Sequence, residues 1–169
     1  MRDKKVLFIT QAAMIAALYV VLTMIANALG LANYAVQIRF SEALTILPYF
    51  TPAAIPGLWV GCILANILTG CAPLDILFGS LATLIGAYFT YAIRKYKWAA
   101  PIPPIVANTV IVPFVLAYVY RFPGSVPYFM LTVGAGEIIS CGILGMILLA
   151  VLNKYAKVIF RNDSPLLTK

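Results

Sequence analysis

The sequence has 169 residues, of which 63% are hydrophobic and 10% are charged, and it contains no histidine. Soluble domains carry roughly 25% charged residues, so this chain cannot cover a water-exposed surface and is predicted to be an integral membrane protein. At about 20 residues for each membrane-spanning helix, the length allows about six spans. We therefore expect a single membrane domain over 1–169, without a separate catalytic or nucleotide-binding domain.

The net charge of +7 is concentrated in three basic clusters, and this distribution argues against nucleic acid as a partner. Long apolar stretches separate the clusters, as expected when basic residues mark the cytoplasmic ends of membrane helices. The clusters are Arg2, Lys4 and Lys5; Arg94, Lys95 and Lys97; and Lys154, Lys157 and Arg161, followed by Lys169.

The predicted elements are six helical spans, at approximately 5–29, 38–50, 53–68, 74–93, 98–119 and 128–153. The second is brief because it ends at Pro48 and Pro52, and several prolines are expected to bend or partly unwind the fifth. An even number of spans places both termini, and all three basic clusters, on one side of the membrane. The predicted fold is thus an all-α membrane bundle with both termini cytoplasmic.

Arg39 and Glu42 open the second span from the outer side and are three residues apart, so their side chains share one helix face. Charged side chains are costly in a membrane and usually turn toward the interior of the bundle. The alternative is an interfacial salt bridge that reaches water and has no further role.

Glu137 is the acid that is hardest to explain without a ligand. It lies about nine residues inside the sixth span, which is about 13 Å at 1.5 Å per residue. The preceding Val133–Gly136 segment is rich in small residues, which allow another backbone or a ligand to approach closely. A carboxylate at that depth needs a donor or a proton, so we interpret Glu137 as a ligand-site residue.

The other polar and aromatic candidates each have a structural alternative. Asp75 follows Pro73 and is favoured as an N-terminal cap of the fourth span. Intramembrane amides often bond neighbouring helices, and aromatic side chains often face lipid or the interface. These remaining candidates are the amides Gln37, Asn66 and Asn108 and the aromatic residues Tyr34, Trp59 and Tyr128.

The cysteines and the alanines are assigned to packing or docking. Cys62, Cys71 and Cys141 form no CxxC pair, so no metal or cofactor is expected. The first span contains two overlapping Ala-x-x-x-Ala pairs, which provide a flat face for packing within the chain or for docking a partner. Gly57 and Gly61 repeat this spacing and are assigned to internal packing. The alanines are Ala12, Ala13, Ala16 and Ala17.

Four segments of the chain resemble a known family. They are VQIRFSEALTILPYFTPAAIPGL (36–58), LDILFGSLATLIGAY (74–88), APIPPIVANTVIV (100–112) and VGAGEIISC (133–141). Together with the alanine pairs, they resemble the queuosine precursor transporter (QueT) family, within the substrate-binding S components of energy-coupling factor (ECF) transporters. The resemblance covers nearly the whole chain from about residue 9 to 150. No G-x-x-x-x-G-K-[ST] phosphate loop occurs, so the chain is not expected to hydrolyse ATP itself.

The resemblance implies a multi-pass protein of the bacterial plasma membrane that captures a 7-deazaguanine, such as preQ1, preQ0 or queuine, from outside the cell. It also implies three partners, a membrane T subunit docked on the alanine face and two ATPase subunits. A carboxylate suits the adjacent N–H and amine donors of a guanine-like base, and Glu137 is the first choice, before Glu42. Donors for the base carbonyl and ring nitrogen would come from Arg39, Gln37, Asn66 or Asn108.

Stacking surfaces would come from Trp59, Tyr34 or Tyr128, and an ammonium on the ligand would need Glu42 or Asp75. Three other hypotheses remain: an S component for a different vitamin, an ion-coupled secondary transporter, and a membrane-embedded enzyme. No inverted repeat of broken helices is evident, which disfavours the secondary transporter. The enzyme ranks last, because the sequence lacks histidine, a metal cluster and an activated nucleophile.

Overall fold

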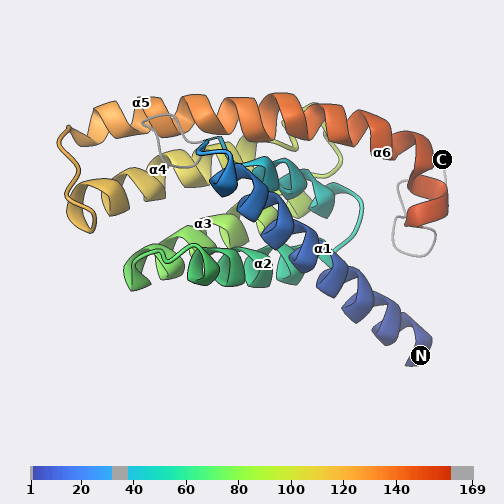
Figure 1. Cartoon of the computed structure of the whole chain (residues 1–169). Coiled ribbons are helices and arrows are strands. Elements are labelled where there is room, and N and C mark those ends of the chain that lie inside the picture. Colours follow the sequence, from blue (N-terminus) through green and yellow to red (C-terminus); the bar gives the residue numbers. More distant parts are fainter. Residues whose placement is uncertain (1, 32–37, 161–169) are drawn as a thin grey trace.

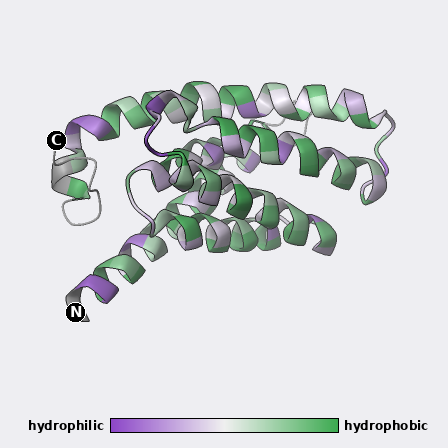
Figure 2. Cartoon of the chain, turned by 180° about the vertical axis from the view of Figure 1, so that it is seen from behind, coloured by the Kyte–Doolittle hydropathy of each residue, from purple (hydrophilic) through white to green (hydrophobic). Residues whose placement is uncertain are grey.

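The structure is a computed structural model and describes residues 2–31 and 38–160. In these residues all regular elements are helices, joined by turns and short loops (Figure 1). Four of the described helical segments are long and apolar enough to cross a membrane: Lys4–Ala28, Pro73–Ala92, Lys97–Tyr118 and Val126–Ala156. Together with the hydropathic colouring in Figure 2, they confirm the prediction of an all-α membrane protein. Six membrane-crossing helices and cytoplasmic termini stay predictions.

The helices begin and end close to the predicted spans. The predicted fifth span is divided, because a short 3₁₀ turn precedes its main helix. The predicted sixth span is a continuous helical rod whose middle is a π-helix (Figure 1). In chain order the elements are α1 (Arg2–Ala28), η1 (Phe40–Tyr49), α2 (Ala54–Leu68), α3 (Pro73–Ala92), η2 (Lys97–Ala99), α4 (Ile102–Tyr118), α5 (Val126–Glu137), η3 (Ile138–Leu144) and α6 (Gly145–Ile159).

The segment predicted as the second span is η1, a 3₁₀-helix of 10 residues. At about 2.0 Å per residue it is about 20 Å long, which is shorter than the roughly 30 Å hydrocarbon core. Every residue from Ser41 to Pro48 is buried, and η1 contacts α1, α2, α3, η3 and α6. It is therefore an interior element of the bundle, and it is shorter than a regular transmembrane α-helix.

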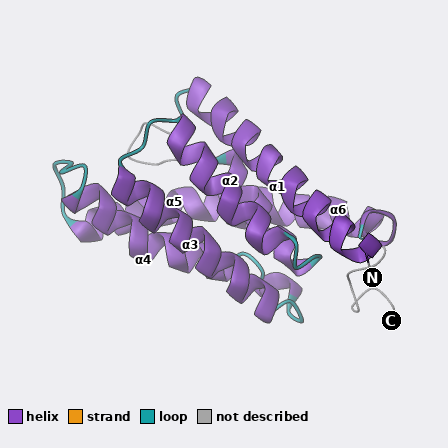
Figure 3. Ribbon diagram, turned by 90° about the horizontal axis from the view of Figure 1, so that it is seen from below, coloured by secondary structure: helices purple, strands orange, loops and turns teal. Residues whose placement is uncertain are grey.

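The remaining helices pack around this interior element. The α5–η3–α6 rod lies along one side of the molecule with α4 beside α5, and α2 and α3 lie side by side on the other (Figures 1 and 3). The α1 helix packs against α2 and η1, and its N-terminal end extends beyond the bundle. The N-terminal end of α1 and the C-terminal end of α6 lie toward the same end of the molecule.

Close packing between α1 and α2 uses part of the predicted alanine face. A Cβ atom at Gly57 would lie 2.7 Å from the carbonyl oxygen of Ala12, and one at Gly61 would lie 3.0 Å from the Cα of Ala16. Gly57 and Gly61 thus pack internally, as expected. Ala12 and Ala16 contact α2 inside the chain, which leaves Ala13 and Ala17 exposed on the other side of α1.

Replacing Gly61 with Ala is expected to lower the thermal stability of the purified protein. Its new methyl group would lie 2.8 Å from the Cβ of Tyr19, and such overpacking costs about 1–3 kcal/mol. Gly142→Ala is the matched control, because its methyl group would meet its nearest neighbour at 3.7 Å. Equal melting temperatures for the two variants in detergent would contradict this account of the α1–α2 contact.

Candidate ligand-binding pocket

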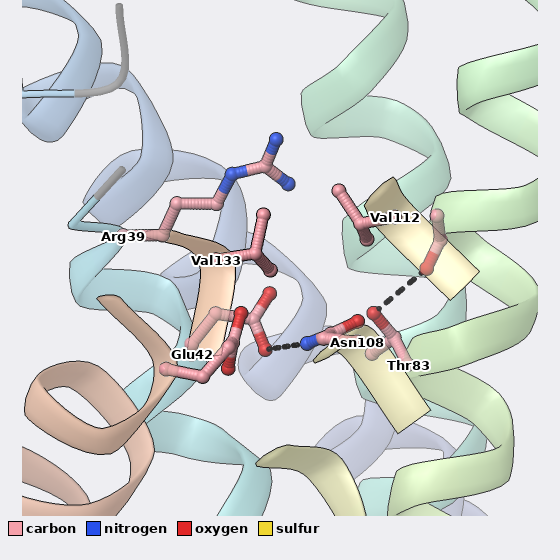
Figure 4. Close-up of a pocket in the computed structure, with 8 residues that line it drawn as sticks. Arg39, Glu42, Thr83, Asn108, Val112 and Val133 are labelled. Carbon is pink, nitrogen blue, oxygen red and sulfur yellow. Dashed lines mark hydrogen bonds between the residues drawn. The ribbon is translucent and has the colours of Figure 1, made fainter. Parts of the chain in front are cut away.

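A polar pocket lies inside the bundle, between η1, α3, α4 and α5. The pocket is small and partly open to the surroundings of the protein. In Figure 4, Arg39 and Glu42 lie on one side of the pocket, and Thr83 and Val112 lie on the other. The lining residues are Arg39, Glu42, Gly79, Thr83, Asn108, Val112, Val133 and Glu137.

Glu42 is a fixed part of the pocket wall. Only 2% of its surface is exposed, and one carboxylate oxygen accepts a hydrogen bond of 2.5 Å from the hydroxyl of Tyr19 on α1. The other oxygen accepts a bond of 3.5 Å from the amide nitrogen of Asn108 on α4 (Figure 4). Since buried carboxylates need donors, these two side chains explain how η1 can carry an acid into the interior of the bundle.

Glu137 enters the pocket at the point where the long rod changes its helical geometry. It is the last residue of α5, directly before the π-helical segment η3. Such π-segments are rare and often occur at functional sites. The Cys141 thiol donates a bond of 3.0 Å to Glu137, and the Ser140 hydroxyl accepts one of 3.3 Å from the backbone N–H of Arg39. The π-segment thus fixes both Glu137 and the start of η1.

The two buried glutamates form an unusual electrostatic pair. One carboxylate oxygen of Glu42, one of Glu137 and the Sγ atom of Cys141 all lie within 4.8 Å of one another. Two negative charges at about that separation repel by about 3 kcal/mol if the effective dielectric constant is about 20. Arg39 lines the same pocket and supplies one positive charge against the pair. The arrangement therefore favours a ligand that brings hydrogen-bond donors or positive charge.

Two carboxylates and a thiol could also ligate a metal ion. The Arg39 guanidinium in the same pocket opposes a divalent cation, and the Cys141 thiol also lies 3.3 Å from the Thr45 hydroxyl. This donor set fits an organic ligand with N–H groups better than it fits a dication.

The pocket brings together four of the residues that the sequence predicted, Arg39, Glu42, Asn108 and Glu137. Asn66 is buried on α2 but does not line the pocket, and its amide donates to the Cys62 sulfur at 3.6 Å. Trp59 and Tyr128 are exposed to 39% and 48%, as expected of side chains that face lipid. Tyr34 and Gln37 lie outside the described residues.

Asp75 was expected to cap the N-terminus of α3, but it does not do so in the structure. The N-cap is Ala72, without a side-chain bond, and the Asp75 carboxylate instead accepts a bond of 2.8 Å from the Tyr120 hydroxyl. That hydroxyl also accepts a bond of 3.0 Å from the backbone N–H of Ala72. Burial raises the pKa of Tyr120 in the α4–α5 loop, so its hydroxyl keeps the proton that it donates to Asp75. This contact fastens the loop to the start of α3, one turn from Gly79.

Four lining residues were missed in the sequence: Gly79, Thr83, Val112 and Val133. Gly79 and Thr83 are four residues apart on α3, so they share a face, and the Thr83 hydroxyl donates to the Gly79 carbonyl at 3.1 Å (Figure 4). This spacing within the 74–88 segment was an available signal. The two valines carried none, because an apolar residue that faces a pocket has the same sequence pattern as one that faces lipid.

A charged pocket inside a bundle of apolar helices is typical of membrane proteins that move polar solutes across the membrane. Residues 9–154 match the QueT transporter family, and the chain belongs to that family. This confirms the resemblance to the QueT family seen in the sequence.

A named relative is similar to part of the chain. The chain is 33% identical over 85 residues to the queuosine precursor transporter QueT of Lactococcus lactis subsp. cremoris (strain MG1363). The match covers 50% of this chain and 50% of that protein, so the chain spans about half the length of the curated relative. No solved structure matches the chain.

Replacing Tyr19 with Phe is expected to destabilise the protein, because a buried carboxylate loses its shortest hydrogen bond. Leaving such an acceptor without its donor costs about 1–3 kcal/mol. Tyr88→Phe serves as the control, since Tyr88 is 59% exposed and also loses only a hydroxyl group. Thermal unfolding in detergent measures the difference, and a Tyr19→Phe protein as stable as the control would show that Glu42 does not depend on Tyr19.

Proposed function

We propose that the chain is the substrate-binding membrane subunit of an importer that takes up a queuosine precursor, a 7-deazaguanine, from outside the cell. The observation that carries this proposal is the pair of buried carboxylates, Glu42 and Glu137, beside Arg39 and Asn108 in one pocket. Membership of the QueT family and the similarity to the queuosine precursor transporter of Lactococcus lactis support the substrate class.

The base edge of a 7-deazaguanine presents a ring N–H and an exocyclic amine as neighbouring donors. One ionised carboxylate accepts both in a bidentate arrangement. Glu137 is the better candidate, because the Cys141 thiol that donates to one of its oxygens is a weak donor. Arg39 and Asn108 supply donors for the base carbonyl. Val112 and Val133 give the flat ring an apolar wall in place of the expected aromatic residues.

The energy for uptake is proposed to come from an ECF module, which consists of a T subunit and two ATPase subunits in the bacterial plasma membrane. In this arrangement the pocket faces outward and both termini are cytoplasmic. The surface proposed to contact the T subunit is the side of α1 that carries Ala13 and Ala17, because both are exposed while Ala12 and Ala16 contact α2. Small residues four apart allow another helix to approach closely.

An ion-coupled secondary transporter is the second candidate, and the two acids in the pocket favour it. Buried carboxylates serve as proton relays in many transporters. Such a protein would take up its substrate without partner subunits and would lose uptake when the ion gradient collapses.

Direct binding of purified protein to a panel of queuosine precursors tests the proposed function. Glu137→Gln is expected to weaken binding about 10- to 100-fold, which corresponds to the roughly 1.5–3 kcal/mol of a hydrogen bond to a charged group. Ser80→Ala on α3 is the control, because the Ser80 hydroxyl bonds only the Leu77 carbonyl at 3.0 Å in the described structure. Unchanged affinity in Glu137→Gln would return this residue to a structural role.

Ala13→Leu and Ala17→Leu are expected to abolish both association with a T subunit and ATP-driven uptake, with ligand binding unchanged. The larger side chains would hold a partner helix away from α1. Ala150→Leu on α6 is the matched control, because Ala150 is an exposed alanine on another helix. Uptake by cells that contain the ECF subunits measures the effect. Uptake that survives in both variants and without the ATPases would favour the secondary transporter.

A further inference from the structure

The side chains that line the pocket do not balance in charge. Glu42 and Glu137 contribute two carboxylates, and Arg39 contributes one guanidinium. The segment 32–37, which precedes Arg39, contains no acidic or basic residue in the sequence. With both glutamates ionised, the lining residues therefore carry one more negative charge than positive charge.

The surroundings of the pair do not restore the balance among the described residues. Tyr19 on α1, Cys62 on α2 and Cys141 on η3 are hydroxyl and thiol groups, which carry no positive charge. Asp75 on α3 is a further acid near Arg39, so it adds to the negative charge. Excess charge in an apolar bundle has to be met by a proton or by a cation.

The two glutamates differ in their freedom to contact a ligand. Both oxygens of Glu42 accept hydrogen bonds from side chains that start on other helices, Tyr19 and Asn108, and 2% of the residue is exposed. Glu137 is exposed to 9%, one of its oxygens accepts a bond from the Cys141 thiol of the next helical turn, and the Asn108 side chain lies close to it. Glu137 thus retains acceptor capacity for a base edge, whereas Glu42 is a fixed charge beside it.

We propose that the pocket selects ligands that carry a positive charge in addition to the donor edge of the base, and that Glu42 is the residue that sets this preference. The inference rests on the proposed function and refines its substrate class to cationic 7-deazaguanines, whose side chain bears an amine. A neutral relative, with a nitrile in place of the aminomethyl group, leaves the excess negative charge unmet. Its binding then requires a proton on the glutamate pair.

The test compares 7-aminomethyl-7-deazaguanine, a cation, with 7-cyano-7-deazaguanine, which is neutral, by calorimetry with the full chain in detergent. The wild-type protein is expected to bind the cation at least about tenfold more tightly, a difference of about 1.4 kcal/mol. Glu42→Gln removes the fixed charge at nearly constant shape, so it is expected to bring the two affinities close together. Glu137→Gln loses the base-edge acceptor and is expected to weaken both ligands.

A second measurement does not depend on the variants folding. Binding heats in buffers of different ionisation enthalpy report the protons that are taken up or released. The glutamate pair is expected to hold about one more proton with the neutral ligand bound than with the cation bound. Glu42→Asp retains the charge and is expected to retain the preference for the cation.

The outcomes separate this inference from the proposed function. If the folded wild-type protein binds neither compound, the proposed function is wrong. Equal affinities, with no difference in bound protons between the two complexes, would leave the proposed function intact and overturn the charge preference. If Glu42→Gln keeps the preference of the wild-type protein, Glu42 is not the selecting residue.

Discussion

The structure depends on the burial of a carboxylate in a bundle that consists mostly of apolar helices. Glu42 is almost fully buried, and its two oxygens are bonded by Tyr19 from α1 and Asn108 from α4. Removing an ionised group from water costs several kcal/mol unless donors replace the water. These donors lie far from Glu42 in the sequence, so the carboxylate has its partners only when η1, α1 and α4 have assembled. The polar pocket and the fold therefore form together.

The same requirement explains why a 3₁₀-helix lies at the centre of the molecule. Its hydroxyl-bearing residues bond outward to the surrounding helices, as in the 2.8 Å bond between Thr23 and Ser41. The Thr51 hydroxyl, just after η1, donates a bond of 3.0 Å to the side-chain amide oxygen of Gln11 on α1. With the Tyr19–Glu42 bond, these contacts tie one face of α1 to the pocket wall. The opposite face of α1 is the exposed one that carries Ala13 and Ala17.

The sequence predicted those parts of the fold that follow from its composition. Apolar stretches separated by turn residues defined the helices, and a buried acid such as Glu137 is rare enough in a membrane to mark the pocket. The nature of η1 was not accessible in this way, because its apolar pattern also fits a short α-helical span. Tyr19 was missed for a similar reason: a tyrosine in an apolar helix gives no sign of whether its hydroxyl meets lipid headgroups or a distant carboxylate. Long-range partners of this kind arise from packing, and one sequence does not encode them locally.

The π-helical segment has a consequence for the two ends of the long rod. A π-turn holds about one residue more than an α-turn, so everything after it is rotated by about 100° relative to a regular α-helix. The side chains of α6, including those of the basic C-terminal end, therefore point in other directions relative to Glu137 than they would in one regular α-helix. Loss or gain of a single residue in 138–144 would change the orientation of Glu137 relative to α6 without altering either flanking helix. A local change of helical phase would therefore change which side chain of the rod faces the pocket.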